Sequence, residues 1–283
     1  MNRKQRRRRI LKLRLTVVGT ILIIAFILAI SVFMNAILGG IADKESSKTE
    51  WIADKESSKT EWIDKQAPTM ESEQMPPKYL IEINGISQDG IPTGCEAVSA
   101  VTALNYLGVN ISPETFINKF LEKEPFYYAG NNLYGANPEE KFAGDPYDRF
   151  SLGCFPPVIA DAIRRMKESG YKRSTDINTK ILDGKSLEEI CKEYVIHNVP
   201  VLVWITMEMI EPGKGTSYYF ADGTKYTWKS YEHCMVLCGY DEDYYYFKDS
   251  LNEGETVKYE KGLVELRYEQ MGSRALAVFR TQK

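Results

Sequence analysis

The most regular pattern of apolar positions begins directly after a loop that ends at Gly94. From Cys95 up to Gly108, apolar side chains recur at helical spacing, at Ala97, Ala100, Val101, Leu104 and Leu107. This spacing is typical of one buried face of an α-helix, and a glycine commonly ends such a helix. The pattern therefore predicts a helix that starts at Cys95, with the thiol in its first turn.

Three further segments carry helix signals. Ser112 precedes Pro113, which is the usual order of an N-cap residue and a proline at the first helical position. Residues 157–169 have helical spacing up to Gly170, and residues 186–189 (Ser-Leu-Glu-Glu) form a capping box. We expect one helix in each segment.

The second half of the chain is dominated by strand patterns, bounded by turn residues. Strands or hairpins are expected at residues 79–83, 199–205, 217–228, 232–240, 244–250, 256–260 and 275–279. The hairpin at 217–228 turns at Asp222-Gly223, and a short helix is expected near 263–271. Helices come first and strands later, mostly in meander order, which predicts an α+β fold rather than alternating βαβ units.

Residues 124–157 show neither pattern and are rich in Gly, Asn, Pro and Tyr. A structureless loop of about thirty residues is unusual inside a compact domain. We therefore expect either a substrate-binding loop or a disordered insert, and the many aromatic residues favour the first. Together with the 217–228 hairpin, this loop would wall a cleft.

The N-terminal part has the composition of a membrane anchor. Residues 1–14 contain eight Lys and Arg and no acid, and Leu15–Leu38 is a run of 24 residues without a charge. As a helix this run would be roughly 36 Å long, enough to cross a hydrocarbon core of about 30 Å. The basic residues predict a cytoplasmic tail, so the chain after residue 38 is expected outside the cell. A cleaved signal peptide is the alternative, although its apolar core would be shorter and no A-x-A-like cleavage site precedes Gly39.

Residues 39–78 are predicted to be a polar linker. The segment IADKESSKTEW occurs twice, at 41–51 and 52–62, and two copies are too few for a solenoid. The linker would carry a folded domain at residues 79–283. Without the eight basic residues of the tail, 28 Lys and Arg stand against 39 Asp and Glu, a net charge of −11. This acidic balance argues against nucleic-acid binding.

All five cysteines lie after the apolar run, at Cys95, Cys154, Cys191, Cys234 and Cys238. An odd number leaves at least one free thiol. On one straight strand, Cys234 and Cys238 would have Cα atoms roughly 13 Å apart, too far for a disulfide or a shared metal. No C-x-x-C spacing occurs, so we expect neither a metal nor a cofactor.

Cys95, His233 and Asp249 form the candidate catalytic set. At a helix start the thiol faces unpaired N–H groups and the positive end of the helix dipole, which favours the thiolate. His233 begins an apolar strand, and the hairpin that follows would bring Asp249 beside it, giving a nucleophile, a base and an orienting acid. Gln88, on the loop before Cys95, would stabilise an oxyanion together with the Cys95 N–H.

Two other residues near these elements are expected to have structural roles. His197 ends the fourth predicted helix, where a histidine stabilises carbonyl groups without catalytic involvement. Glu96 is expected to act as a first-turn acid of its helix, and the alternative is that it modulates the neighbouring thiol.

Three segments together resemble the C-39-like peptidase family, papain-like relatives of the bacteriocin-processing peptidases that cleave after double-glycine leaders. They are QDGIPTGCEAVSAVTALNYLG, GDPYDRFSLGCFPPVIADAI and EHCMVLCGYDEDYYYFKDS, and the likeness spans roughly residues 81–279. The resemblance implies a papain-like fold in which the nucleophile helix packs against an antiparallel sheet, with the cleft between them. It also implies the residue roles: Cys95 as nucleophile, His233 as base, Asp249 as orienting acid and Gln88 as oxyanion donor.

The implied protein is a bacterial, membrane-anchored, extracellular cysteine peptidase or amide hydrolase that acts on a peptide or cell-wall substrate. Transporter-fused relatives carry a multi-pass membrane domain and an ATPase, and this sequence has neither, so leader cleavage coupled to export is not expected. Two alternatives remain. One is a cell-wall amidase or endopeptidase, since related folds cut peptidoglycan stem peptides, and the other is a catalytically inactive surface binding module.

Overall fold

The computed structural model describes residues 75–281, within a compact unit that runs from Glu73 to Lys283. The predicted tail at 1–14, the predicted span at 15–38 and most of the linker at 39–78 lie outside the described residues. In the part that is described, no helix is both long and apolar enough to span a bilayer.

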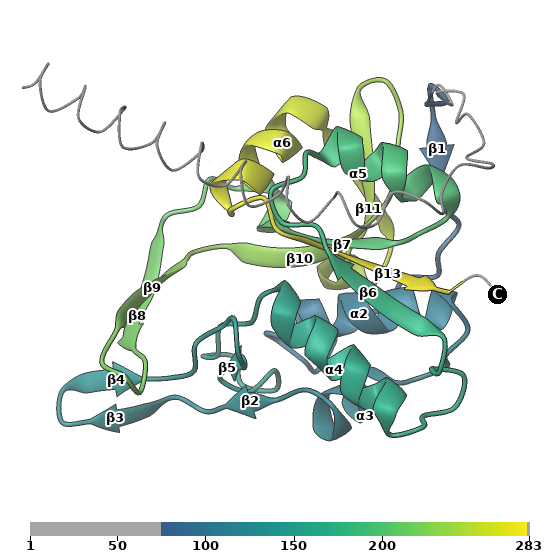
Figure 1. The fold of residues 1–283 in the computed structure, drawn as a ribbon. Coiled ribbons are helices and arrows are strands. Elements are labelled where there is room, and N and C mark those ends of the chain that lie inside the picture. The colour runs from purple at the N-terminus through teal and green to yellow at the C-terminus, as the bar shows by residue number, and fades with distance from the viewer. Residues whose placement is uncertain (1–74, 282–283) are drawn as a thin grey trace, which may run out of the picture. The chain divides into compact units, whose positions relative to one another are not determined.

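A seven-stranded sheet forms the centre of this unit (Figure 1). Six of its strands lie side by side in the order β12-β11-β10-β7-β13-β6, and the seventh, β1, pairs with β10. All of these neighbouring strands are antiparallel. The strands are β1 (Tyr79–Leu80), β6 (Ile177–Ile181), β7 (Val201–Thr206), β10 (Glu232–Tyr240), β11 (Tyr244–Lys248), β12 (Thr256–Glu260) and β13 (Ala275–Arg280). The apolar runs of β7 and β10 are buried along their whole length, because helices cover both faces of the sheet.

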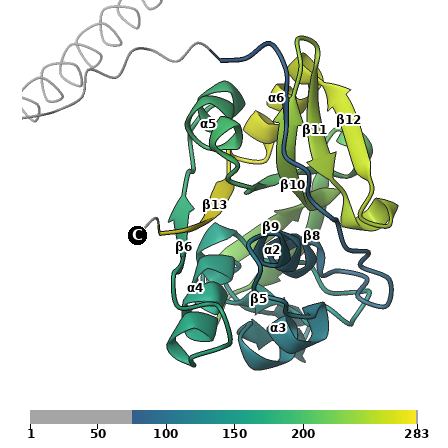
Figure 2. The same ribbon diagram turned by 90° about the vertical axis from the view of Figure 1, so that its right-hand side faces the viewer.

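Two groups of helices provide that cover. One face carries α2 (Cys95–Tyr106), α3 (Pro113–Lys119) and α4 (Pro156–Glu168), and the other carries α5 (Leu187–Glu193) and α6 (Lys261–Gln270). Figures 1 and 2 show the first group below and the second above the central strands. Alternate residues of β7 point to opposite faces: Leu202 and Trp204 pack with the α2 group, whereas Val203 and Ile205 pack with the α5 group.

The helix predictions are confirmed, with small shifts at the ends. The Oγ atom of Ser112 accepts the N–H of Thr115 at 3.2 Å and caps α3, and Ser186 with Glu189 completes the capping box of α5. Gly108 has φ +82, a conformation that L side chains rarely adopt, and it follows the end of α2. The 217–228 hairpin is also confirmed, with Gly223 at φ +87 in its turn.

Some strands were not foreseen or are shorter than expected. Residues 124–157 contain short strands rather than a structureless loop: β3 (Tyr127–Ala129), β4 (Asn132–Tyr134) and β5 (Phe142–Ala143), preceded by β2 (Lys123–Glu124). β3 and β4 join β8 (Lys214–Tyr219) and β9 (Lys225–Lys229) in a four-stranded sheet of order β3-β4-β8-β9. The half-polar β6 had no strand pattern, and only residues 79 and 80 of the 79–83 segment form a strand. Three 3-10 turns complete the fold: η1 (Val195–His197), η2 (Met207–Met209) and η3 (Ser250–Asn252).

Candidate active site

Cys95 is the first residue of α2, and a tight turn places it there. The N–H of Ile91 donates to the carbonyl of Gln88 at 2.8 Å, and the N–H of Gly94 donates to the carbonyl of Ile91 at 3.1 Å. A Cβ atom at Gly94 would lie 2.4 Å from Cγ2 of Ile91, so this turn requires glycine. The thiol is only 6% exposed and sits at the helix N-terminus, as the sequence predicts.

His233 and Asp249 meet across the β10–β11 hairpin. Nε2 of the imidazole lies 2.7 Å from Oδ1 of the carboxylate, and both side chains are buried. The N–H of Leu251 also donates to Oδ1, at 2.9 Å. Burial by itself would raise the pKa of Asp249, but the hydrogen bond and charge of His233 outweigh it and hold the pKa below its usual value. The carboxylate is therefore ionised near neutral pH and holds the ring through Nε2.

Gln88 is held in place by the loop after β11. Its backbone N–H donates to the carbonyl of Ser250 at 3.1 Å, and the hydroxyl of Ser250 donates to Oε1 of Gln88 at 2.6 Å. Its Nε2 atom makes only long contacts, 3.4 Å to the carbonyl of Ile91 and 3.5 Å to that of Pro92. The side-chain amide is thus fixed through its oxygen, while its N–H groups are weakly used.

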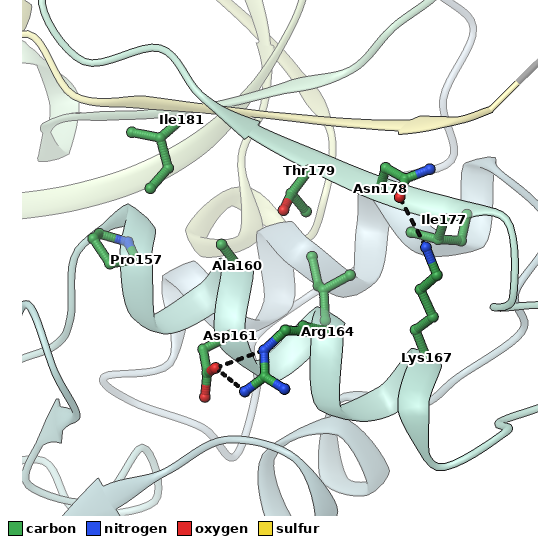
Figure 3. A pocket seen from close by; sticks show the side chains of 10 residues that line it. Pro157, Ala160, Asp161, Arg164, Lys167, Ile177, Asn178, Thr179 and Ile181 are labelled. Atoms are coloured by element: carbon green, nitrogen blue, oxygen red, sulfur yellow. Dashed lines mark hydrogen bonds and ion pairs between the residues drawn. The ribbon is translucent and has the colours of Figure 1, made fainter.

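Three of the four predicted site residues line one cleft. Gln88, Cys95 and His233 lie on the wall of a cavity of about 360 Å³, together with Trp228 and Glu232. Asp249 lies behind His233 and supports it. A second hollow of similar size lies between α4 and β6 (Figure 3) and is lined by none of the predicted residues. The first cavity is therefore the candidate active site. His197, at the exposed end of η1, takes no part in that cavity.

The immediate partner of the thiol is Glu96 rather than His233. Sγ of Cys95 donates to Oε2 of Glu96 at 3.3 Å, and Oε1 of Glu96 accepts the N–H of Cys154 at 2.7 Å. Gly153 makes room for this carboxyl, because a Cβ there would lie 2.2 Å from Oε1. Within residues 75–281, Nδ1 of His233 has no hydrogen-bond partner. Glu96 is therefore more than the simple first-turn acid that the sequence suggested.

A second carboxyl group, that of Glu232, lies close to the thiol, and the sequence did not identify it as a site residue. Glu232, the first residue of β10, is 6% exposed, and its Oε1 atom has no partner among the described residues. Sγ of Cys95, one carboxylate oxygen of Glu96 and one of Glu232 all lie within 4.8 Å of one another. The sequence feature that could have indicated Glu232 as a site residue is its position as a glutamate at the start of an otherwise apolar strand.

Burial, together with these carboxyls, reverses the expected effect on the pKa of the thiol. Burial, followed by the charges of Glu96 and Glu232, raises the pKa of Cys95 well above its usual value. This raised pKa contradicts the prediction that the helix start favours the thiolate, and burial is its largest cause. Burial also raises the pKa of Glu96 to about 7, and burial together with Glu96 raises that of Glu232.

Comparison with known proteins identifies this arrangement of helix, sheet and cleft. The Peptidase_C39 like family matches residues 80–276. The chain belongs to that family. As in the expected papain-like fold, α2 packs against β10 and β7 of an antiparallel sheet.

Individual proteins similar to this chain are also known. A putative C39-like peptidase from Bacillus anthracis has a solved structure that matches with a TM-score of 0.60 and 26% identity, over 74% of this chain and 100% of that chain. The uncharacterized protein YvpB of Bacillus subtilis (strain 168) is 27% identical over 202 residues, 71% of this chain and 75% of its own length. A double glycine motif protease from an AMS/PCAT transporter, solved in complex with a leader peptide, is more distant, with a TM-score of 0.40 and 14% identity.

Proposed function

We propose that this C39-like chain is a cysteine peptidase whose catalytic residues are Cys95, His233, Asp249 and Gln88. The main support for the proposal is that Asp249 fixes the orientation of the His233 imidazole. Asp249 binds Nε2 of His233 at 2.7 Å, and Nδ1 is left without a partner among the described residues. Because Cys95 lines the same cleft as that ring, Nδ1 is the available acceptor for the thiol proton.

The proposed reaction begins when the thiol turns from Glu96 toward the imidazole. The proton passes from Sγ of Cys95 to Nδ1 of His233, and the thiolate attacks the carbonyl carbon of the scissile bond. The Cys95 N–H and Nε2 of Gln88 donate to the oxyanion. The imidazolium then protonates the leaving amine. Water, deprotonated by Nδ1, hydrolyses the thioester and restores the thiol.

The cleft is walled by the segments that the sequence singled out. Arg149 and Leu152 come from the long 124–157 segment, and Thr216 and Trp228 come from the β8–β9 hairpin. The match to the Peptidase_C39 like family supports a peptide as the ligand of this cleft. We therefore assign peptide or amide bonds as the substrate class.

Anchoring of the enzyme at the outer face of the cell membrane belongs to the same proposal. It is supported by the uncharged run Leu15–Leu38 behind eight basic residues. Fractionation of cells followed by protease treatment of intact cells tests it. A membrane-bound chain whose C-terminal part is digested from outside agrees with the proposal, whereas a chain released as a shorter soluble form indicates a cleaved signal peptide.

Activity is tested with the purified full-length chain in detergent. It is incubated with a peptide library and, separately, with purified peptidoglycan, and the products are identified by mass spectrometry. Cys95→Ala should abolish every cleavage event, because it removes the nucleophile. Cys191→Ala is the matched control, because Cys191 is a buried thiol on the opposite face of the sheet and should retain activity.

Each outcome distinguishes between the functions. Peptide cleavage that depends on Cys95 supports the peptidase. Release of muropeptides without peptide cleavage identifies a cell-wall hydrolase that uses the same residues. Cleavage that survives in Cys95→Ala refutes the mechanism, and an intact protein with no activity on either substrate favours the binding module.

A further inference from the structure

The mechanism above leaves two buried carboxyl groups next to the nucleophile without a function. Glu96 follows Cys95 at the start of α2, and Glu232 begins β10, so tertiary packing alone brings them together. Sγ of Cys95, one oxygen of Glu96 and one oxygen of Glu232 lie within 4.8 Å of one another, and all three residues are buried.

No basic side chain in the described part of the chain is paired with this cluster. In residues 75–281, neither Glu96 nor Glu232 forms an ion pair with a lysine or arginine. Buried carboxylates are normally paired or bound to a metal. Oε1 of Glu232 has no hydrogen-bond partner in this part of the chain although the residue is 94% buried (6% exposed). Such an orphaned acceptor is rare in a native fold and points to a missing ligand.

We infer that Cys95, Glu96 and Glu232 bind one divalent cation of the zinc type, which occupies the nucleophile and blocks it. A thiolate with two carboxylates is a ligand set that zinc accepts. Tetrahedral zinc, at about 2.0–2.3 Å from each ligand, holds neighbouring ligand atoms roughly 3.3–3.8 Å apart. Sγ of Cys95 and Oε2 of Glu96 already lie 3.3 Å apart.

The surroundings also resemble those of a metal site. The N–H of Cys154 donates to the other oxygen of Glu96 at 2.7 Å, and outer hydrogen bonds of this kind orient metal ligands. Cys95 and Glu232 line the catalytic cleft, so an ion held by these residues would be reached from the cleft; zinc sites with three protein ligands commonly keep a fourth position for water. Binding releases the thiol proton to the solvent and forms the sulfur–metal bond, with no change in oxidation state.

The consequence is an enzyme that divalent zinc switches off reversibly. This inference goes beyond the peptidase proposal, and its test does not require turnover. If the chain were only a binding module, the same three ligands would still hold the ion.

The test measures protection of Cys95 from alkylation. The full-length chain is purified in detergent, stripped with EDTA, and treated with iodoacetamide with and without Zn²⁺, and labelling of Cys95 is followed by mass spectrometry. Zn²⁺ should slow labelling by about tenfold or more, because the metal-bound thiolate is no longer free to react. A chromophoric chelator in competition measures the affinity directly and should report one ion per chain.

Variants distinguish this three-residue site from an alternative in which the ion is bound by Cys95 and His233. Glu232→Gln and Glu96→Gln should each lose most of the protection, and the amide oxygen at position 96 can still accept the N–H of Cys154. His233→Ala should keep the protection. Glu208→Gln is the matched control, because Glu208 is an exposed acid beside the cleft residue Met207, and it should behave like the wild type.

Two results would overturn the inference. One is the absence of Zn²⁺ protection in the wild-type chain, which would mean that protons neutralise the acid pair. The other is protection that persists in both glutamine variants and disappears in His233→Ala, which would assign the ion to a cysteine–histidine pair.

Discussion

Replacing Glu96 by Gln should change how the stability of the domain depends on pH. Burial raises the pKa of this carboxyl from 4.5 to about 7 in the folded chain. A folded-state pKa above the unfolded value means that the folded state binds the extra proton, so stability falls as pH rises between the two values. The stability that the folded state gains from this bound proton is complete below about pH 4.5 and is lost as pH rises through about 7. A shift of this size corresponds to about 3 kcal/mol, and Glu96 is fully buried, so solvent does not screen it.

The assay is urea unfolding of residues 73–283 in buffer with EDTA, at about pH 4.5 and about pH 8. In the wild type the free energy of unfolding should fall by about 3 kcal/mol more between these pH values than in Glu96→Gln. The amide can still accept the N–H of Cys154, so the variant keeps that contact. Glu208→Gln, at an exposed position, should follow the wild type. Parallel curves for wild type and Glu96→Gln would refute the reasoning, because they would show that ionisation of Glu96 costs the fold nothing.

Three further predictions concern the site and the fold. Asp249→Asn should lower kcat by about 100-fold or more with little change in KM, because the imidazole loses the carboxylate that orients it; steady-state kinetics on a cleaved peptide measures this, and a change in KM alone would contradict it. Ser250→Ala removes the hydroxyl that donates to Oε1 of Gln88 at 2.6 Å, and kcat should fall roughly tenfold as the oxyanion donor loses its fixed position; an unchanged kcat would show that the Ser250 hydroxyl does not position Gln88 for catalysis. Ser112→Ala removes the cap of α3 and should lower the free energy of unfolding by about 1 kcal/mol with activity unchanged; urea unfolding checks it, and an unchanged midpoint would show that the cap contributes nothing.

The elements that the sequence predicted well are those specified by short-range signals. The limits of α2 follow from Cys95 after a turn that requires Gly94 and from Gly108 at positive φ. The caps at Ser112 and Ser186 set the starts of α3 and α5 through contacts three residues away. The fully apolar β7 and β10 are recognisable because both faces of each strand are covered.

Strands that depend on distant partners were not predictable in this way. β4 pairs with β8 through Tyr134 and Tyr219, and β6 is held by β13 although its own sequence is half polar. The segment 124–157 therefore appeared structureless. Its β3–β4 hairpin is local, but β4 pairs with β8, which only the folded chain brings near, and a local pattern carries no information about such a partner.

The sequence alone determined the family resemblance, the order of the candidate catalytic residues and the helix that presents Cys95. A helix start and a hairpin are local structures, and the hairpin places Asp249 against His233. Only the tertiary structure decided the electrostatic environment of the thiol. Glu232 lies 137 residues after Cys95 along the chain and reaches it through the packing of β10 on α2. Because burial and two neighbouring acids raise the pKa of the thiol, this pKa depends on the packing and could not be read from the residues around Cys95.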